Sequence, residues 1–220
     1  MRTKAFTLAE VLITLGIIGI VAAMTLPTVI NKYQKEATVT QLKKTYTILN
    51  QAFRQAEVEN ESSQYWNESS NQANVLFEKY WKPYLKSPKI CTSENGACGY
   101  KKQAPWKQIN GKNDDYCVYL NDYRLSIMLA DGQFVSIVSG SGYDLNDKRM
   151  IIDLNGSKSP NTFGRDTFLF IRISGKGIMP YGYELSSNTV NNDCSKTGKG
   201  YMCAAKIIKD NWNITDDYPW

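Results

Sequence analysis

The sequence predicts an α+β protein in which a long N-terminal helix, apolar enough to span a membrane, packs on a small antiparallel β-sheet head. Three observations lead to this prediction: an apolar run over residues 6–30, a one-sided apolar pattern over residues 39–56, and short β-rich runs after residue 115. One long helix followed by a group of strands is typical of the α+β class.

The apolar run extends from Phe6 to Ile30, and Glu10 is its only charged residue. As a helix it would measure about 37 Å at 1.5 Å per residue, which exceeds the roughly 30 Å of a bilayer's hydrocarbon core. A carboxylate inside such a span costs free energy unless it has a partner or lies near the helix end, as Glu10 does. Arg2 and Lys4 form a short basic leader, which favours a cytoplasmic N-terminus.

The segment Lys4-Ala5-Phe6-Thr7-Leu8-Ala9-Glu10 resembles the prepilin signal of type IV pilins and type II secretion pseudopilins. The resemblance implies cleavage between Ala5 and Phe6 by a prepilin peptidase, followed by methylation of the new α-amino group. It also implies that Glu10 pairs with the N-terminus of a neighbouring subunit during filament assembly. Ala5 departs from the family pattern, which has glycine before the cut. Pro27 lies where pilin helices often carry a proline, so we expect a kink or local unwinding there.

Two other interpretations of the N-terminus remain open at this point. An ordinary secretory signal would have Arg2 and Lys4 as its basic region and Val21-Ala22-Ala23 as its cleavage site. Glu10 would then lie inside the apolar core of that signal, where a charge is unfavourable. Alternatively, Glu10 is simply an interfacial residue whose carboxylate reaches water.

The apolar pattern continues beyond the membrane-length run but becomes one-sided. Apolar residues recur at spacings of three and four, which is the pattern of an amphipathic helix: Val39, Leu42, Tyr46, Leu49, Phe53 and Ala56. Residues 28–60 contain no proline or glycine. We therefore expect one helix from Phe6 to about Val58. The predicted organisation is a leader (1–5), a membrane or filament-core helix (6–30), its amphipathic continuation (31–58) and a globular head (59–220).

Composition excludes several classes of function. The 220 residues carry a formal charge of +5 and show no basic cluster, so no nucleic-acid binding is expected. The sequence contains no histidine, which removes histidine-dependent catalytic triads and imidazole zinc sites. We therefore predict that the protein is not an enzyme and requires no cofactor.

The five cysteines would lie on the outer side of the membrane, where oxidising conditions favour pairing. Local spacing favours two bridges, Cys91–Cys98 and Cys194–Cys203, and leaves Cys117 as a buried apolar residue within a strand-like run, 116–120. Two bridges among five cysteines can be drawn in fifteen ways, and reduced cysteines are the alternative. The second pair resembles the C-terminal disulfide loop of many pilins.

The head is predicted to contain three or four antiparallel strands. The β-rich runs are 124–129, 133–138, 150–154 and 167–173, and Ala130-Asp131-Gly132 is a hairpin turn signal between the first two. The polar segment 57–74 reads as a surface loop. The head also contains five tryptophans that offer either a carbohydrate-binding face or core positions: Trp66, Trp81, Trp106, Trp212 and Trp220.

The loop between the last two runs contains four hard oxygen ligands, Asp153, Asn155, Asn161 and Asp166, around a glycine-containing turn. Oxygen ligands of this kind suit calcium, and major pseudopilins of type II secretion bind calcium in a late loop of the head. The spacing is not that of an EF-hand. The alternative is an Asx-rich turn whose side chains bond their own backbone.

These observations predict a structural subunit of a type II secretion pseudopilus or a type IV pilus-like filament. Its expected partners are other pilin subunits, a prepilin peptidase and an inner-membrane assembly platform. It would cross the inner membrane once, with a cytoplasmic N-terminus and a periplasmic or extracellular head. The calcium loop favours a pseudopilin, whereas the Cys194–Cys203 loop favours a surface pilin. The alternative function is a membrane-anchored or secreted ligand-binding protein that forms no filaments.

Overall fold

The computed structural model describes residues 7–66, 73–92, 96–100, 106–114, 124–138 and 148–220. The chain divides into two compact units, Met1–Ala37 and Thr38–Trp220. Helix α1 (Leu8–Glu59) contributes to both units. The predicted leader and the predicted free cysteine, Cys117, lie outside the described residues, and the four predicted domain boundaries stay predictions.

Helix α1 confirms the expected long N-terminal helix and ends one residue after the predicted Val58. We expected a kink or local unwinding at Pro27. The helix runs through Pro27 without interruption, so it is not unwound there. In its second half the apolar stripe is buried, as expected for an amphipathic helix; the buried residues are Val39, Leu42, Thr45, Leu49, Ala52, Phe53 and Ala56.

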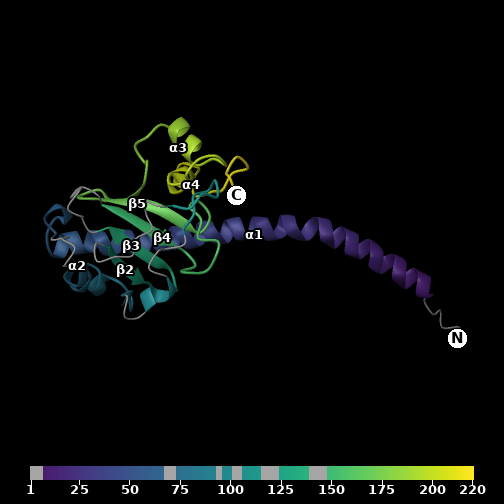
Figure 1. Ribbon diagram of the computed structural model, residues 1–220, viewed down its shortest axis with the longest axis horizontal. Helices are drawn as coiled ribbons and strands as arrows, with labels where there is room; N and C mark the ends of the chain where they lie inside the picture. The colour runs from purple at the N-terminus through teal and green to yellow at the C-terminus, as the bar shows by residue number, and fades with distance from the viewer. Residues whose placement is uncertain (1–6, 67–72, 93–95, 101–105, 115–123, 139–147) are drawn as a thin grey trace. The chain divides into compact units, whose positions relative to one another are not determined.

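A six-stranded antiparallel sheet with strands in sequential order forms the centre of the head (Figure 1). Its strands are β1 (Lys89–Ile90), β2 (Arg124–Met128), β3 (Phe134–Val138), β4 (Arg149–Asp153), β5 (Thr167–Ile173) and β6 (Gly177–Pro180). The middle four confirm the predicted β-rich runs within a residue or two. The β2–β3 hairpin turns at Gly132, whose φ of 85° is a conformation that glycine adopts readily. Strands β1 and β6 were not predicted.

Successive side chains of a strand point to opposite sides of the sheet. In this sheet both sides are buried. The face covered by α1 carries the main core, with Leu125, Val135, Ile152 and Phe170 among its residues. Side chains of the opposite face pack with aromatic residues from outside the sheet and form a second core. It consists of Tyr100, Trp106, Phe134, Ile151, Phe163 and Leu169. This second face holds the loop that the sequence singled out as a candidate ligand site.

Polar side chains of α1 bond the edge strand β6 and its preceding turn. The Asn50 amide oxygen accepts a hydrogen bond from the backbone N–H of Ile178 at 3.0 Å. The Arg54 guanidinium donates to the carbonyl of Lys176 at 2.8 Å. Pro180 has no N–H to offer, so the donors of this edge are either bonded or missing. An edge protected in this way is a poor template for pairing with another strand.

Among the described residues, the head also contains helix α2 (Ala73–Tyr80), the C-terminal helices α3 (Ser187–Asp193) and α4 (Cys203–Lys209), and the 3₁₀ turns Ser63–Tyr65, Lys82–Tyr84 and Gly96–Gly99. The predicted surface loop 57–74 is wrong at its start, where α1 continues to Glu59. Trp66 is buried in this segment, stacked on Tyr80 with ring centroids 4.2 Å apart. Part of this polar segment is buried because burial of the large apolar ring of Trp66 is favourable.

Candidate functional site

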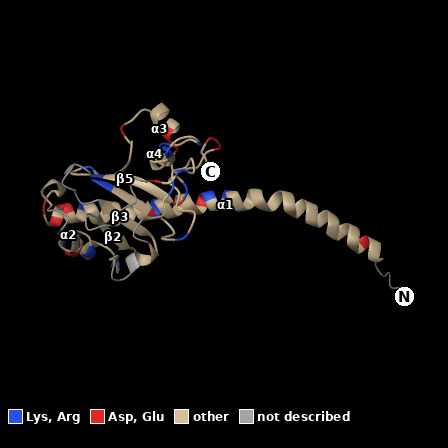
Figure 2. Ribbon diagram, in the orientation of Figure 1, with Lys and Arg blue, Asp and Glu red and all other residues tan. Residues whose placement is uncertain are grey.

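The first part of α1 is an apolar helix with an exposed surface. From Leu8 to Ile30 its large apolar side chains are exposed, with Leu8 and Met24 the most accessible. Figure 2 shows an isolated acidic position near the start of this helix. In the sequence, Glu10 is the one charged residue from Phe6 to Ile30. By length and composition α1 can cross a membrane. An exposed apolar surface of this extent marks a membrane or protein interaction site.

Glu10 forms a capping box with Thr7 at the start of α1. The Glu10 carboxylate accepts hydrogen bonds from the Thr7 backbone N–H and hydroxyl, both at 2.8 Å. The Glu10 N–H in turn donates to the Thr7 hydroxyl oxygen at 3.3 Å. This reciprocal pattern satisfies donors that a helix N-terminus otherwise leaves unbonded. The Thr-x-x-Glu signature is visible in the sequence, yet our sequence interpretation assigned Glu10 only an assembly role. Ala5 and Phe6, the predicted processing residues, lie outside the described residues.

The predicted ligand loop places two carboxyl groups in the aromatic core. Asp153, at the end of β4, is fully buried and accepts hydrogen bonds from the Trp106 indole N–H at 3.0 Å and the Thr167 hydroxyl at 3.3 Å. Asp166 is also buried and accepts from the backbone N–H groups of Asn161 and Thr162 at 2.8 and 2.7 Å. Both aspartates therefore bond their own loop and its neighbours.

Asn155 connects the two carboxyl groups. Its backbone N–H donates to Asp153 at 3.3 Å, and its side-chain N–H donates to Asp166 at 3.1 Å. The side-chain oxygens of Asn155 and Asn161 are buried without a hydrogen-bond partner. The structure thus brings all four predicted residues into one loop, although their contacts are those of an Asx-rich turn.

The hydrogen bonds of this loop account for its geometry without an ion. Each carboxylate accepts three hydrogen bonds, out of about four lone-pair sites. The unpartnered side-chain oxygens of Asn155 and Asn161 are of the kind that calcium takes as ligands. In the part of the chain that the structure describes, no group of three or more His, Cys, Asp and Glu side chains could hold a metal ion. The geometry favours the hydrogen-bonded turn, and calcium binding stays a prediction that titration tests.

Burial changes the acidity of both aspartates. Burial of the Asp153 carboxyl group, reinforced by the nearby charge of Asp166, raises its pKa to about 7. Burial likewise raises the pKa of Asp166, although its backbone hydrogen bonds oppose the shift. The buried Tyr100 hydroxyl also has a raised pKa, through burial and then the charge of Asp153. A carboxyl group with a pKa near neutrality exchanges its proton over the physiological pH range.

Both predicted disulfides are confirmed. Cys91–Cys98 lies between β1 and β2 in sequence, and Cys194–Cys203 joins the end of α3 to the start of α4. The second pair is almost completely buried, whereas Cys91 and Cys98 are half-buried. Closing a loop of about ten residues stabilises a fold by on the order of 2–3 kcal/mol.

The tryptophans do not form the carbohydrate-binding face that the sequence left open. Trp66, Trp81 and Trp106 are buried, and Trp212 and Trp220 pack against the main core. Sequence reasoning also missed the buried Lys206, which bonds acceptors on three separate segments. Asp210 is a local partner four residues along, whereas Asn191 and Asp217 lie 15 and 11 residues away, beyond the reach of a local helix pattern.

Comparisons with known proteins cover nearly the whole chain. Residues 1–26 match the model of the prokaryotic N-terminal methylation motif, the prepilin-type signal of type IV pilins and pseudopilins. Residues 28–220 match the model of a family of unknown function, DUF6613. Searches of the curated proteins and of the solved structures found no match. The chain is therefore a member of family DUF6613 whose N-terminus carries the prepilin-type methylation motif.

Proposed function

We propose that the protein is a structural subunit of a type II secretion pseudopilus or a type IV pilus-like filament, and not an enzyme. The observation that supports this most strongly is the exposed apolar helix that begins within the methylation motif. Glu10 is its only charged residue as far as Ile30. In water this surface would be costly, because apolar area contributes about 25 cal/mol per Å² when it is buried. A bilayer before assembly and a bundle of identical helices after assembly would both cover it.

The motif implies processing by a prepilin peptidase and assembly into pilin polymers. In our proposal the chain crosses the inner membrane once, with its N-terminus in the cytoplasm and residues 38–220 outside. An inner-membrane assembly platform and other pilin subunits would be its partners. The Cys194–Cys203 disulfide loop supports a surface pilin, whereas calcium binding by the 153–166 loop would support a pseudopilin.

A second candidate function is a membrane-anchored binding protein that forms no filaments. The same exposed helix supports this function, because α1 is long and apolar enough to act as a membrane anchor. An anchor of this kind does not require assembly into a filament. The two functions differ in where the mature chain is found, since only a filament subunit leaves the membrane.

Mechanical shearing of native cells that overproduce the chain tests the proposal. We expect the processed chain in the sheared fraction, in filaments that immunoelectron microscopy labels along their length. A matched strain that lacks the assembly ATPase should retain the chain in the membrane fraction. Retention in the membrane in both strains would contradict the filament proposal and support the anchor.

A further inference from the structure

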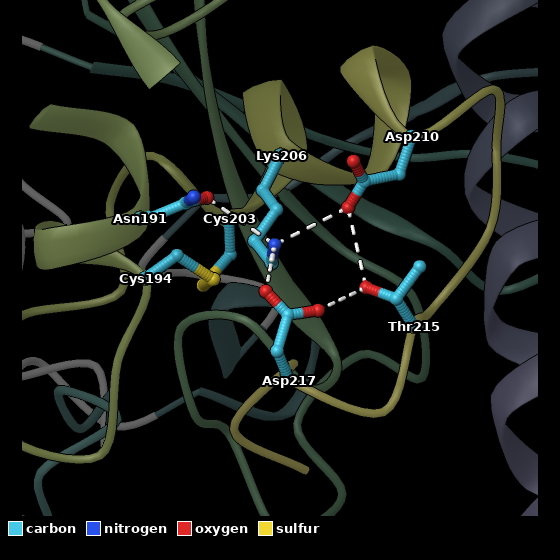
Figure 3. Close-up of polar contacts among 7 residues, drawn as sticks. All are labelled: Asn191, Cys194, Cys203, Lys206, Asp210, Thr215 and Asp217. Carbon is cyan, nitrogen blue, oxygen red and sulfur yellow. Dashed lines mark hydrogen bonds and ion pairs between the residues drawn. A yellow bond between two sulfur atoms is a disulfide. The ribbon is translucent and has the colours of Figure 1, made fainter. Parts of the chain in front are cut away.

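Helices α3 and α4 are connected by two neighbouring links, one covalent and one polar (Figure 3). The covalent link is the Cys194–Cys203 disulfide. The polar link is a hydrogen bond of 3.2 Å from the Lys206 ammonium to the Asn191 side-chain oxygen. Asn191 lies three residues before Cys194 and Lys206 lies three residues after Cys203, so each pair occupies one face of its helix. The polar link therefore lies beside the disulfide.

Lys206 also holds the last ten residues of the sequence, 211–220, which we call the C-terminal strap. Its ammonium contacts the carboxylates of Asp217 in the strap at 2.7 Å and of Asp210 at 3.3 Å. With Asn191, these acceptors use all three N–H groups of a lysine. The Lys206 side chain is 5% exposed, whereas that of Asp217 is 64% exposed. The strap is thus held by one buried cation and one accessible anion.

The charge states of this pair keep the strap attached over a wide pH range. Burial alone would lower the pKa of Lys206, but the hydrogen bonds that its ammonium donates to Asp217 and Asp210 outweigh burial and raise that pKa. The hydrogen bond from Lys206 lowers the pKa of Asp217. The pair therefore stays ionised at neutral pH, and its contribution is lost only in strong acid or strong base.

The strap packs close to the disulfide through the loop between β4 and β5. Its Tyr218 is buried in the core and donates a hydrogen bond of 2.5 Å to the carbonyl oxygen of Gly164. Gly164 lies directly against the disulfide, since a Cβ placed on it would be 2.7 Å from the Cys203 sulfur. Cys203 is fully buried and Cys194 is 2% exposed. Ile214 and Tyr218 of the strap belong to the same buried core cluster as the two cysteines.

We propose that the strap, held by the Lys206–Asp217 pair, protects the Cys194–Cys203 disulfide from thiol–disulfide exchange. A dithiol reductant or a thiol–disulfide oxidoreductase would react with this bond only while the strap is detached. The protein would thus have one exchange-resistant and one accessible disulfide. This inference concerns the head alone and does not depend on filament assembly.

The chemistry requires access to one of the two sulfurs. A thiolate of the reagent attacks one cysteine sulfur, forms a mixed disulfide and expels the other cysteine as a thiolate. The second thiol of the reagent then attacks the mixed disulfide, so the reagent is oxidised and both cysteines are reduced, with two electrons transferred. A buried sulfur reacts only through local opening, so its rate reports the fraction of molecules in which the strap is detached.

The test follows both disulfides in one sample of the oxidised full-length protein in detergent micelles. Dithiothreitol is added at neutral pH, samples are quenched with iodoacetamide, and mass spectrometry measures the alkylation of each cysteine pair over time. In the wild type we expect Cys91–Cys98 to open at least tenfold faster than Cys194–Cys203. Asp217→Asn and Lys206→Met should each accelerate the opening of Cys194–Cys203 at least tenfold and leave Cys91–Cys98 within twofold of its wild-type rate.

Asp216→Asn is the matched control. Asp216 is the exposed neighbour of Asp217 in the strap, and its substitution removes the same charge. It should leave both rates unchanged. If Lys206→Met accelerates both disulfides, that variant is globally unfolded and Asp217→Asn decides the question. Cys194–Cys203 opening at the wild-type rate in Asp217→Asn, or as fast as Cys91–Cys98 in the wild type, would overturn the proposal.

Discussion

Replacement of Glu10 by Gln or by Ala is expected to reduce filament assembly at least tenfold while leaving the chain in the membrane. The capping box explains why both variants are needed. Glutamine still accepts the Thr7 N–H hydrogen bond but has no charge, whereas alanine removes both the cap and the charge. A carboxylate in a membrane costs roughly 2.5–3.5 kcal/mol at the helix centre and less near the end, so pairing it with a neighbouring N-terminus favours assembly.

Sheared-filament yield, normalised to the total amount of processed chain, measures this effect. Glu36→Gln is the matched control, because Glu36 is an exposed acid farther along the same helix and should have no effect on yield. Wild-type yield for Glu10→Gln would show that the helix cap, and not the charge, is what assembly requires. Wild-type yield for both Glu10 variants would remove the assembly role of this residue.

Replacement of Asp153 by Asn is expected to remove the loss of stability that the wild type shows as the pH rises. The variant also carries a pH-independent cost, because an amide nitrogen cannot accept the hydrogen bonds that one of the carboxylate oxygens accepts. The folded-state pKa of about 7 lies above the unfolded value of 3.8, so the folded protein binds the proton more tightly. Wild-type stability contributed by this group is therefore fully present below pH 3.8, falls as the pH rises, and is lost above about pH 7. The loss amounts to about 4 kcal/mol at most, at 1.36 kcal/mol per pKa unit. Asparagine carries no charge and avoids this loss.

Urea unfolding of the full-length protein in micelles, at pH 4.5 and pH 8, measures the free-energy difference between variant and wild type. We expect that difference to increase by a few kcal/mol in favour of Asp153→Asn at pH 8. Asp216→Asn, an exposed aspartate, should show no such increase. A flat difference would contradict a buried proton-binding site. Stabilisation of the wild type, but not of the variant, by millimolar calcium at pH 8 would instead establish the calcium site.

Local periodicity explains which parts of the fold were predictable. The apolar stripe from Val39 to Ala56 and the β-rich runs that form β2 to β5 are properties of single segments, and each was confirmed. Strand β6 escaped prediction because it combines Gly177 and Pro180 in four residues, both unfavourable in strands. It forms a strand because it pairs with β5 and because Asn50 bonds its outer edge.

In the candidate sites too, features set by local sequence were predictable, and features set by tertiary contacts were not. Cys91–Cys98 and Cys194–Cys203 were predictable because short spacing favours pairing. The environment of Asp153 was not, because Trp106 lies 47 residues away and reaches it only in the folded protein. Lys206 looks like an ordinary helical lysine in the sequence. Asp210 is its neighbour four residues along, but only tertiary structure brings Asn191 and Asp217 to it.

Mass spectrometry of the mature N-terminus, on protein taken from native membranes, tests the central claim most directly. The claim is that this chain is a prepilin-type precursor processed between Ala5 and Phe6. The account predicts a chain that begins at N-methylated Phe6. A chain that begins at Met24 would indicate ordinary secretion, and an uncut Met1 would indicate a plain membrane anchor; either result would contradict the account.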